Sequence, residues 1–233
     1  MESIRIEYRF NLDPQTRETI TLFFDAESFE PLTEARRGLP RWTELRFHRC
    51  PHCPLNADCE THCPVAVSLV DVVERFSTVL SYDEIDLEVV TEERRVLQRT
   101  TAQAAISSLI GLLMATSGCP HTSYFKPMAR FHLPMASEAE TLFRAAGMYL
   151  LAQYFYSVAG CGGELDFTGL KEIYDNLHTL NVSVAGRLRE ASQVDSSLNA
   201  VIILDMYAKA VPYVIDETLE EIRSYYNPYF NPG

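Results

Sequence analysis

The chain has six cysteines and six histidines, and ten of these twelve residues lie in two short stretches. Residues 48–63 hold seven of them: Cys50, Cys53, Cys59 and Cys63, with His48, His52 and His62. Residues 119–132 hold Cys119, His121 and His132. Thiolate and imidazole are the ligands of zinc and iron–sulfur sites, and a packed core does not need so many of them in so short a segment. The residue types therefore predict a metal-binding protein.

The spacing in the first stretch predicts which side chains bind the metal. It reads Cys50-Pro-His-Cys53, then five residues, then Cys59-Glu-Thr-His-Cys63-Pro64. A two-residue gap lets two thiolates chelate one ion, and a second pair can complete a tetrahedron. We predict one site per chain with Cys50, Cys53, Cys59 and Cys63 as ligands, and with His48, His52 and His62 as alternative ligands.

The identity of the metal is left open by this pattern, with structural zinc favoured. An iron–sulfur cluster is the alternative, because iron–sulfur loops commonly run C-x2-C-x2-C-x3-C-P. The last gap and the following proline match that pattern here, whereas the middle gap is longer. A redox-active or incidental set of thiols is the third interpretation.

The second stretch allows two hypotheses for the role of Cys119. In the first, Cys119 is a nucleophile, His121 or His132 is its base, and Lys126 and Arg130 hold an anion. In the second, Cys119 is a buried structural residue, because it follows the carboxyl end of an expected helix, where the dipole raises a thiol pKa. It could also fold back beside the first cysteine cluster. Cys161, beside a glycine-rich turn, is expected to be inert.

The amino-acid composition indicates a globular protein and argues against a general nucleic-acid binder. A hydrophobic content of 47% and a charged content of 22% are ordinary for a globular protein. The net charge of −12 argues against a general nucleic-acid binder. Five arginines before the first cysteine either offset thiolate charge on a solvated face or form a phosphate-binding patch: Arg36, Arg37, Arg41, Arg46 and Arg49.

Targeting signals are also absent from the sequence pattern. The amino terminus lacks the apolar run of a secretory signal, and no stretch of ~20 apolar residues predicts a membrane span. We therefore expect a cytoplasmic, reducing location in which the cysteines are ligands or thiols, with no nucleic acid and no membrane as partner. An unknown protein partner or a homo-oligomer is left open.

Hydrophobic periodicity predicts the elements that must position these residues. Alternation indicates strands at 4–10, 19–24, 85–90 and 95–100, and a third early strand at 42–47 that leads into the cysteines. One apolar stripe predicts a helix at 65–80. From residue 102 the pattern is helical, with helices at 104–114, 138–159 (capped by Ser137), 167–188 and 198–222 (kinked at Pro212).

The fold predicted by this order is α+β. Residues 1–100 form a β-rich part, in which an amino-terminal antiparallel sheet carries the cysteine-rich metal knuckle at 48–64. Residues 101–233 form a mainly helical part. The two parts are either separate or one continuous domain. The tail at 227–233 is not expected to continue a helix. Asp205 lies on an apolar stripe, so it either pairs with an arginine or histidine of the second stretch or turns to the edge of the stripe.

Three strings in the chain resemble a family of uncharacterised bacterial proteins classed as a domain of unknown function. They are Cys50-Pro-His-Cys-Pro-Leu55, Met114-Ala-Thr-Ser-Gly-Cys-Pro120 and Met128-Ala-Arg-Phe-His-Leu-Pro134. The resemblance covers most of the chain and is weakest beyond about residue 160. It implies no catalytic role, but it implies that Cys119 and His132 belong to the family pattern.

Two functions follow as hypotheses. The first is a soluble, non-catalytic protein in which a structural zinc site holds the β-rich part against the helices. The second is an iron–sulfur redox protein, or an enzyme that uses Cys119 with His121 and His132.

Overall fold

A four-stranded antiparallel sheet forms the amino-terminal layer, as the alternation predicts. The computed structural model describes residues 2–33, 36, 38–191 and 195–231, so Arg37 and the last two residues of the tail lie outside the described part. The strands are β1 (Ser3–Asn11), β2 (Arg17–Asp25), β3 (Glu84–Val90) and β4 (Arg95–Thr101), in the order β2-β1-β3-β4. Ile6, Tyr8 and Phe10 of β1 are buried on the covered face of the sheet, and Glu7 on the opposite face is buried in ion pairs with Arg5 and Arg9.

The third early strand is not formed. Arg41–Thr43 is a 3-10 helix, η1, and residues 44–47 are a bridge and a turn in which only Glu44 pairs, with His62. The prediction of a strand at 42–47 was wrong because the carbonyl groups of this segment are used elsewhere. Those of Trp42, Glu44 and Leu45 accept hydrogen bonds from the buried Arg187 side chain and so do not serve a ladder.

The helix predicted at 65–80 is split. It forms α1 (Pro64–Ser68) and α2 (Val70–Arg75), with Leu69 between them. The apolar stripe is nevertheless buried as predicted through Phe76, whereas Leu80 is exposed. Burial of a stripe does not require unbroken helical hydrogen bonding.

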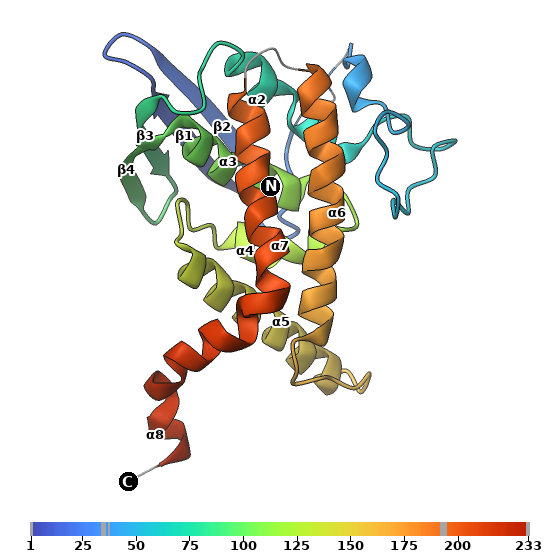
Figure 1. Cartoon of the computed structure of the whole chain (residues 1–233), viewed down its shortest axis with the longest axis vertical. Helices are drawn as coiled ribbons and strands as arrows, with labels where there is room; N and C mark the ends of the chain where they lie inside the picture. The colour runs from blue at the N-terminus through green and yellow to red at the C-terminus, as the bar shows by residue number, and fades with distance from the viewer. Residues whose placement is uncertain (1, 34–35, 37, 192–194, 232–233) are drawn as a thin grey trace.

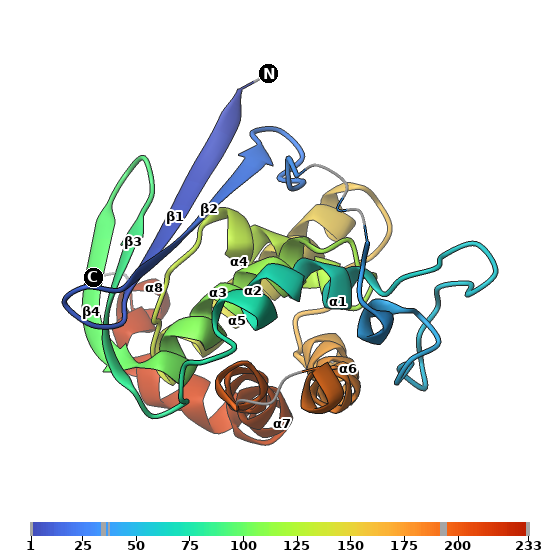
Figure 2. The same ribbon diagram turned by 90° about the horizontal axis from the view of Figure 1, so that it is seen from above.

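The helical layer follows the sheet. Its longer members are α3 (Ala102–Thr116), α5 (Glu138–Val158), α6 (Thr168–Ala191) and α7 (Ser196–Ile222), and the short η2 (Ser123–Phe125) and α4 (Lys126–Arg130) connect α3 to α5. Ser137 caps α5 as predicted. Figures 1 and 2 show α6 and α7 side by side, with the sheet on the far side of α3. One buried cluster joins the sheet to α1, α2, α3, α6 and α7, and a second joins α5, α6 and α7.

The carboxyl-terminal tail is helical, against expectation. After α7 come η3 (Arg223–Tyr226) and α8 (Asn227–Phe230), and this segment leads away from the body (Figure 1). Pro228 lies in the first turn of α8, where its missing N–H would have no helical partner anyway. Among the described residues, the continuous helical segment Ser196–Phe230 alone is long and apolar enough to cross a membrane, by length and composition only. Such a test is also passed by core helices of soluble proteins.

Candidate functional site

The cysteine-bearing loop is held against α6 by one buried arginine. The Arg187 side chain, with 1% of its surface exposed, donates from Nη1 to the carbonyl groups of Trp42 (2.8 Å) and Glu44 (2.7 Å). Its Nη2 donates to the carbonyl of Leu45 at 3.2 Å. The loop after this anchor projects past α6, away from the sheet (Figure 2). Backbone carbonyls thus fix where the cysteine segment begins.

A second contact brings the loop close to the same helix. A Cβ at Gly186 would lie 2.9 Å from Nδ1 of His48, so this glycine permits the approach. Nε2 of His48 lies 2.6 Å from a carboxylate oxygen of Glu190, one turn further along α6. His48 is therefore engaged with α6 and not with the thiols.

Four of the six cysteines pack in or against the same core, but they are not the four that spacing predicted. Cys63 and Cys119 are buried, and Cys50 and Cys53 are partly buried against the same core. Burial raises the pKa of Cys50 to about 11, and repulsion from Cys63, Cys53 and Cys119 adds to the rise. Burial likewise raises the pKa of Cys119, with smaller contributions from Cys63 and Cys53. Cys50 therefore lies within electrostatic range of the other three thiols, and Cys119 within range of Cys53 and Cys63.

Cys59 lies apart from this group. Its side chain is exposed, and its sulfur accepts a long contact from the Asn56 amide at 3.6 Å. The turn at 56–59, in which the Cys59 N–H donates to the Asn56 carbonyl, directs this side chain to solvent. Cys161, on the turn after α5, is also exposed.

The compact knuckle predicted at 48–64 is not seen. Within residues 2–33, 36, 38–191 and 195–231, no three Cys, His, Asp or Glu side chains are arranged to hold a metal ion. The physical reason is the position of Cys59, which cannot join the other three loop thiols while its turn faces outward. Cys119, just after the carboxyl end of α3, packs in the same core as the other three, but within the described residues these four sulfurs are not arranged around a metal position either.

A sequence signal for this grouping was present and was missed. Each of the four core cysteines is followed directly by a proline, at positions 51, 54, 64 and 120. Cys59 is followed by Glu60, and Cys161 by Gly162. Proline removes a backbone donor next to the sulfur and holds the preceding residue extended. The presence of a following proline would therefore have distinguished, from the sequence alone, the four core cysteines from the two exposed ones.

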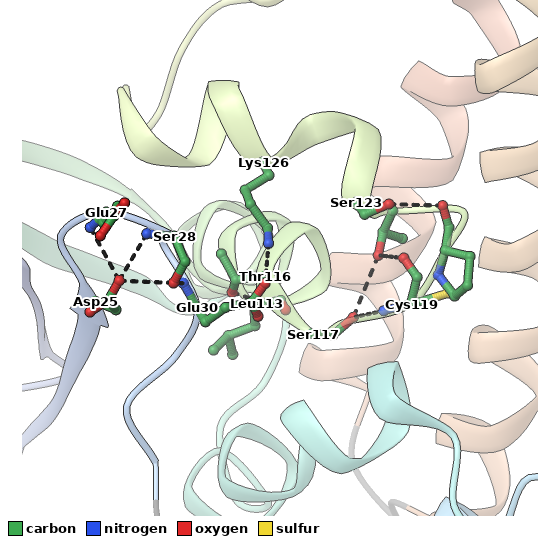
Figure 3. Close-up of polar contacts among 12 residues, drawn as sticks. Asp25, Glu27, Ser28, Glu30, Leu113, Thr116, Ser117, Cys119, Ser123 and Lys126 are labelled. Atoms are coloured by element: carbon green, nitrogen blue, oxygen red, sulfur yellow. Dashed lines mark hydrogen bonds and ion pairs between the residues drawn. The ribbon is translucent and has the colours of Figure 1, made fainter. Parts of the chain in front are cut away.

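Three hydrogen bonds fix the turn that carries Cys119. Gly118 has a φ of +85°, which ends α3 in the left-handed region that favours glycine. The Cys119 N–H donates to Oγ of Ser117 at 3.2 Å, and its carbonyl accepts from the N–H groups of Thr122 (3.1 Å) and Ser123 (3.0 Å). Figure 3 shows this turn, with Lys126 reaching toward Glu30 on the other side of α3.

Two histidines stack beside the cysteine group. The rings of His52 and His121 lie 4.0 Å apart, and Nε2 of His121 donates to the His52 carbonyl at 3.0 Å. Nε2 of His52 in turn donates to the Asn176 carbonyl on α6 at 3.0 Å. Burial, with the charge of His121, lowers the pKa of His52, so this ring is held neutral. His62 instead bonds Oγ1 of Thr43 at 2.8 Å.

The residues proposed as a catalytic set are dispersed. His121 faces His52, whereas His132 bonds the hydroxyl of Tyr8 on β1. The guanidinium of Arg130 lies over the rings of Phe131 (5.2 Å) and Phe29 (6.0 Å). His121 is therefore close to Cys119 in sequence. The contacts of His132 and Arg130 described above are with other residues and not with the Cys119 thiol.

Asp205 does find a partner, although not in the second stretch. Its carboxylate accepts from Nδ1 of His178 on α6 at 2.7 Å. The expectation that an arginine or histidine near Cys119 would fill this role was wrong, because α6 and α7 pack side by side and bring His178 to it first.

A large cavity lies among α3, α4, α5, α6 and α7. Its volume is about 1060 Å³, and its lining is mainly apolar. His132 lines it, as do Arg144 and Asn181. Burial lowers the pKa of His132 to about 3, so the ring is neutral and accepts the Tyr8 hydroxyl proton in a hydrogen bond. Sequence periodicity gave no sign of this cavity.

The family model described as "Domain of unknown function (DUF6901)" matches residues 6–227. The chain belongs to this family. The DUF6901 match spans the sheet, both cysteine stretches and the cavity, and so extends well beyond residue 160, where the sequence resemblance was weakest. No curated protein and no solved structure matches this DUF6901 chain.

Proposed function

We propose that this DUF6901 protein binds one metal ion through the thiolates of Cys50, Cys53, Cys63 and Cys119, and that the metal is structural zinc. The proposal rests on one observation above all: the four cysteines that precede a proline come from three separate segments and pack in or against one buried core. Four thiolates are a common donor set for structural zinc. Bound in this way, the metal ties the loop at 44–63 to the turn after α3.

The charge of the surroundings fits such a centre. Four thiolates on a divalent ion leave a net charge of −2, and a buried site needs a cation to offset it. Arg187 is buried near the cysteines. Burial lowers the pKa of its guanidinium, and the nearby Cys63, Cys50 and Cys53 act in the opposite direction. Its Nε has no hydrogen-bond partner within the described residues. A negatively charged thiolate centre would stabilise this otherwise uncompensated guanidinium.

The raised thiol pKa values make metal binding dependent on pH. A ligating cysteine must lose its proton, so a thiol with a pKa of about 11, as at Cys50, releases that proton only when the metal binds. Metal affinity is therefore expected to fall as the pH is lowered. The thiols are reduced in a cytoplasmic setting, which we also propose for this protein.

An iron–sulfur cluster on the same four cysteines is the second candidate. The observation that favours it is the proline after every grouped cysteine, because the fourth cysteine of iron–sulfur loops is commonly followed by proline. A nucleophilic role for Cys119 is less well supported, because its thiol is buried and its pKa is raised.

The test is metal analysis of protein purified without oxygen. We expect native mass spectrometry to show one bound ion per chain, lost in Cys119→Ser and Cys53→Ser and kept in the matched controls Cys59→Ser and Cys161→Ser. An absorption band near ~400 nm would assign the site to iron–sulfur instead of zinc. Metal-free protein under these conditions would contradict the proposal. Loss in Cys59→Ser with retention in Cys119→Ser would restore the ligand set predicted from spacing.

A further inference from the structure

The cavity among the helices is large enough for a small molecule, and no cysteine is among its described lining residues. At about 1060 Å³ it is at the upper end of the range for sites that bind drug-sized ligands. Exposed residues are part of its lining, with Glu138, Ala210 and Glu221 at its rim, so the cavity reaches the surface. Its interior is formed by aliphatic, aromatic and methionine side chains, which favour an apolar ligand body.

One polar group in the lining is unsatisfied. Asn181 of α6 is fully buried, and neither its Nδ2 nor its Oδ1 has a hydrogen-bond partner within the described part of the chain. A side-chain amide offers two donors and an acceptor, and a buried amide without partners is unfavourable. Asn181 is also part of the cavity wall. The lining therefore presents an adjacent donor and acceptor to whatever fills the cavity.

Several other polar side chains of the lining are already paired. The Arg144 guanidinium donates to the carbonyl groups of Met128 (2.8 Å) and Phe131 (2.7 Å), at the end of α4. The Tyr207 hydroxyl donates to the Glu138 carbonyl at 3.5 Å, and His132 bonds Tyr8. Asn181 thus differs from these side chains in that both its donor and its acceptor lack a partner within the described residues.

We propose that this cavity binds an uncharged amphipathic molecule whose apolar body carries a carboxamide-like group paired with Asn181. A carboxamide carbonyl accepts from Nδ2 while its N–H donates to Oδ1, so both Asn181 groups are satisfied at once. A carboxylate would leave Oδ1 without a donor. An ammonium group would leave Nδ2 without an acceptor and would enter a cavity that already holds the Arg144 cation.

Decanamide is the probe, with decanoate and decylammonium as head-group controls of the same chain length. At a decanamide concentration about ten times Kd, we expect Tm to rise by about 3 to 6 °C, and titration calorimetry should give one site per chain. The two charged analogues should bind about tenfold or more weakly. Equal binding of all three compounds, or no binding of decanamide, would overturn the proposal.

Two variants locate the site. Asn181→Leu removes the polar group while keeping the volume, so it should weaken decanamide binding by about tenfold and raise the Tm of the ligand-free protein. The matched control is Asn176→Leu, an exposed asparagine of the same helix, which should bind normally. Ala210→Trp, at the rim, should block entry without touching Asn181. Unchanged affinity in both Asn181→Leu and Ala210→Trp would place the ligand elsewhere and refute the proposed site.

Discussion

Arg187 and Asn181 show how much depends on which face of one helix a polar residue occupies. They are six positions apart on α6, so at about 100° per residue they face different surroundings. Arg187 meets the carbonyl groups of the cysteine-bearing segment, whereas Asn181 meets the apolar cavity. Both are almost fully buried, yet one is largely satisfied by backbone and the other is not. Buried polar groups of these two kinds mark the two sites proposed here.

His132 predicts a pH dependence of stability. Its folded-state pKa of about 3 lies well below the usual value of about 6.5, so between these values the unfolded chain binds a proton that the folded chain does not. This histidine therefore contributes stability above pH 6.5, and that contribution is lost as the pH falls toward 3. We expect it to add about 1.4 kcal/mol per pH unit to the decline in unfolding free energy.

Urea unfolding at intervals between pH 7 and pH 4 measures this dependence. His132→Gln keeps a hydrogen-bonding group near Tyr8 but does not titrate, so its unfolding free energy should decline less steeply than that of the unchanged protein. The comparison cancels the contribution of carboxylates, which titrate in both. Parallel curves would show that His132 titrates at about the same pKa in the folded protein as in the unfolded chain.

At the scale of elements, sequence patterns predicted the helices and strands whose backbone hydrogen bonds are made within the same helix or sheet. The strands of the sheet pair with each other, and α5 begins where Ser137 predicts. The segment at 42–47 failed because its carbonyl groups bond to a side chain 140 residues or more away along the chain. No local pattern records such a partner.

The cap of α5 is a quantitative test of one such local signal. The Ser137 hydroxyl accepts from the Glu140 N–H at 3.3 Å, and the Glu140 carboxylate accepts from the Ser137 N–H at 2.8 Å. Ser137→Ala should lower the free energy of unfolding by about 1 kcal/mol. In thermal unfolding this corresponds to a fall in Tm of about 2 to 4 °C. Ser157→Ala, an exposed serine near the other end of α5, should leave Tm within about 1 °C.

The end of the helical layer carries much exposed apolar surface. Tyr213 of α7 is 84% exposed and Met206 is 68% exposed, and in α8 Tyr229 is 82% exposed. Only 28% of the most apolar window of Ser196–Phe230 is buried. Periodicity predicted the buried stripe of α7 through Ala208, Val211 and Ile215, but it did not predict how much of the opposite face would be apolar.

For the whole molecule, the proposal predicts one part whose order depends on the metal and one part that folds without it. The sheet and α3 share an extensive apolar core, with Ile6, Phe10, Ile106 and Leu109 at 2% exposure or less. The loop at 44–63 buries little apolar surface, chiefly Leu45. Because ligation would supply much of the order of this loop, metal removal should affect it first.

Hydrogen exchange before and after chelation tests this division. We expect amide protection to fall at 44–63 and at the turn 117–123, and to persist in β1, β3 and α3. Cys59→Ser should show the same pattern as the unchanged protein. Uniform protection after complete metal removal would mean that the ion does not order the loop, and global unfolding would mean that the core depends on it.

The sequence alone determined the α+β class, the four strands and the long helices, because periodicity and caps act over a few residues. It also determined that thiols and imidazoles gather at 48–63 and at 119–132. Only the tertiary structure decided that Cys119 packs in the same core as Cys50, Cys53 and Cys63 while Cys59 faces solvent. It also decided that His132 belongs to a cavity shared with Asn181. The reason is that the packing of α3, α4, α6 and α7 brings together residues that are distant in sequence, and spacing along the chain carries no record of that packing.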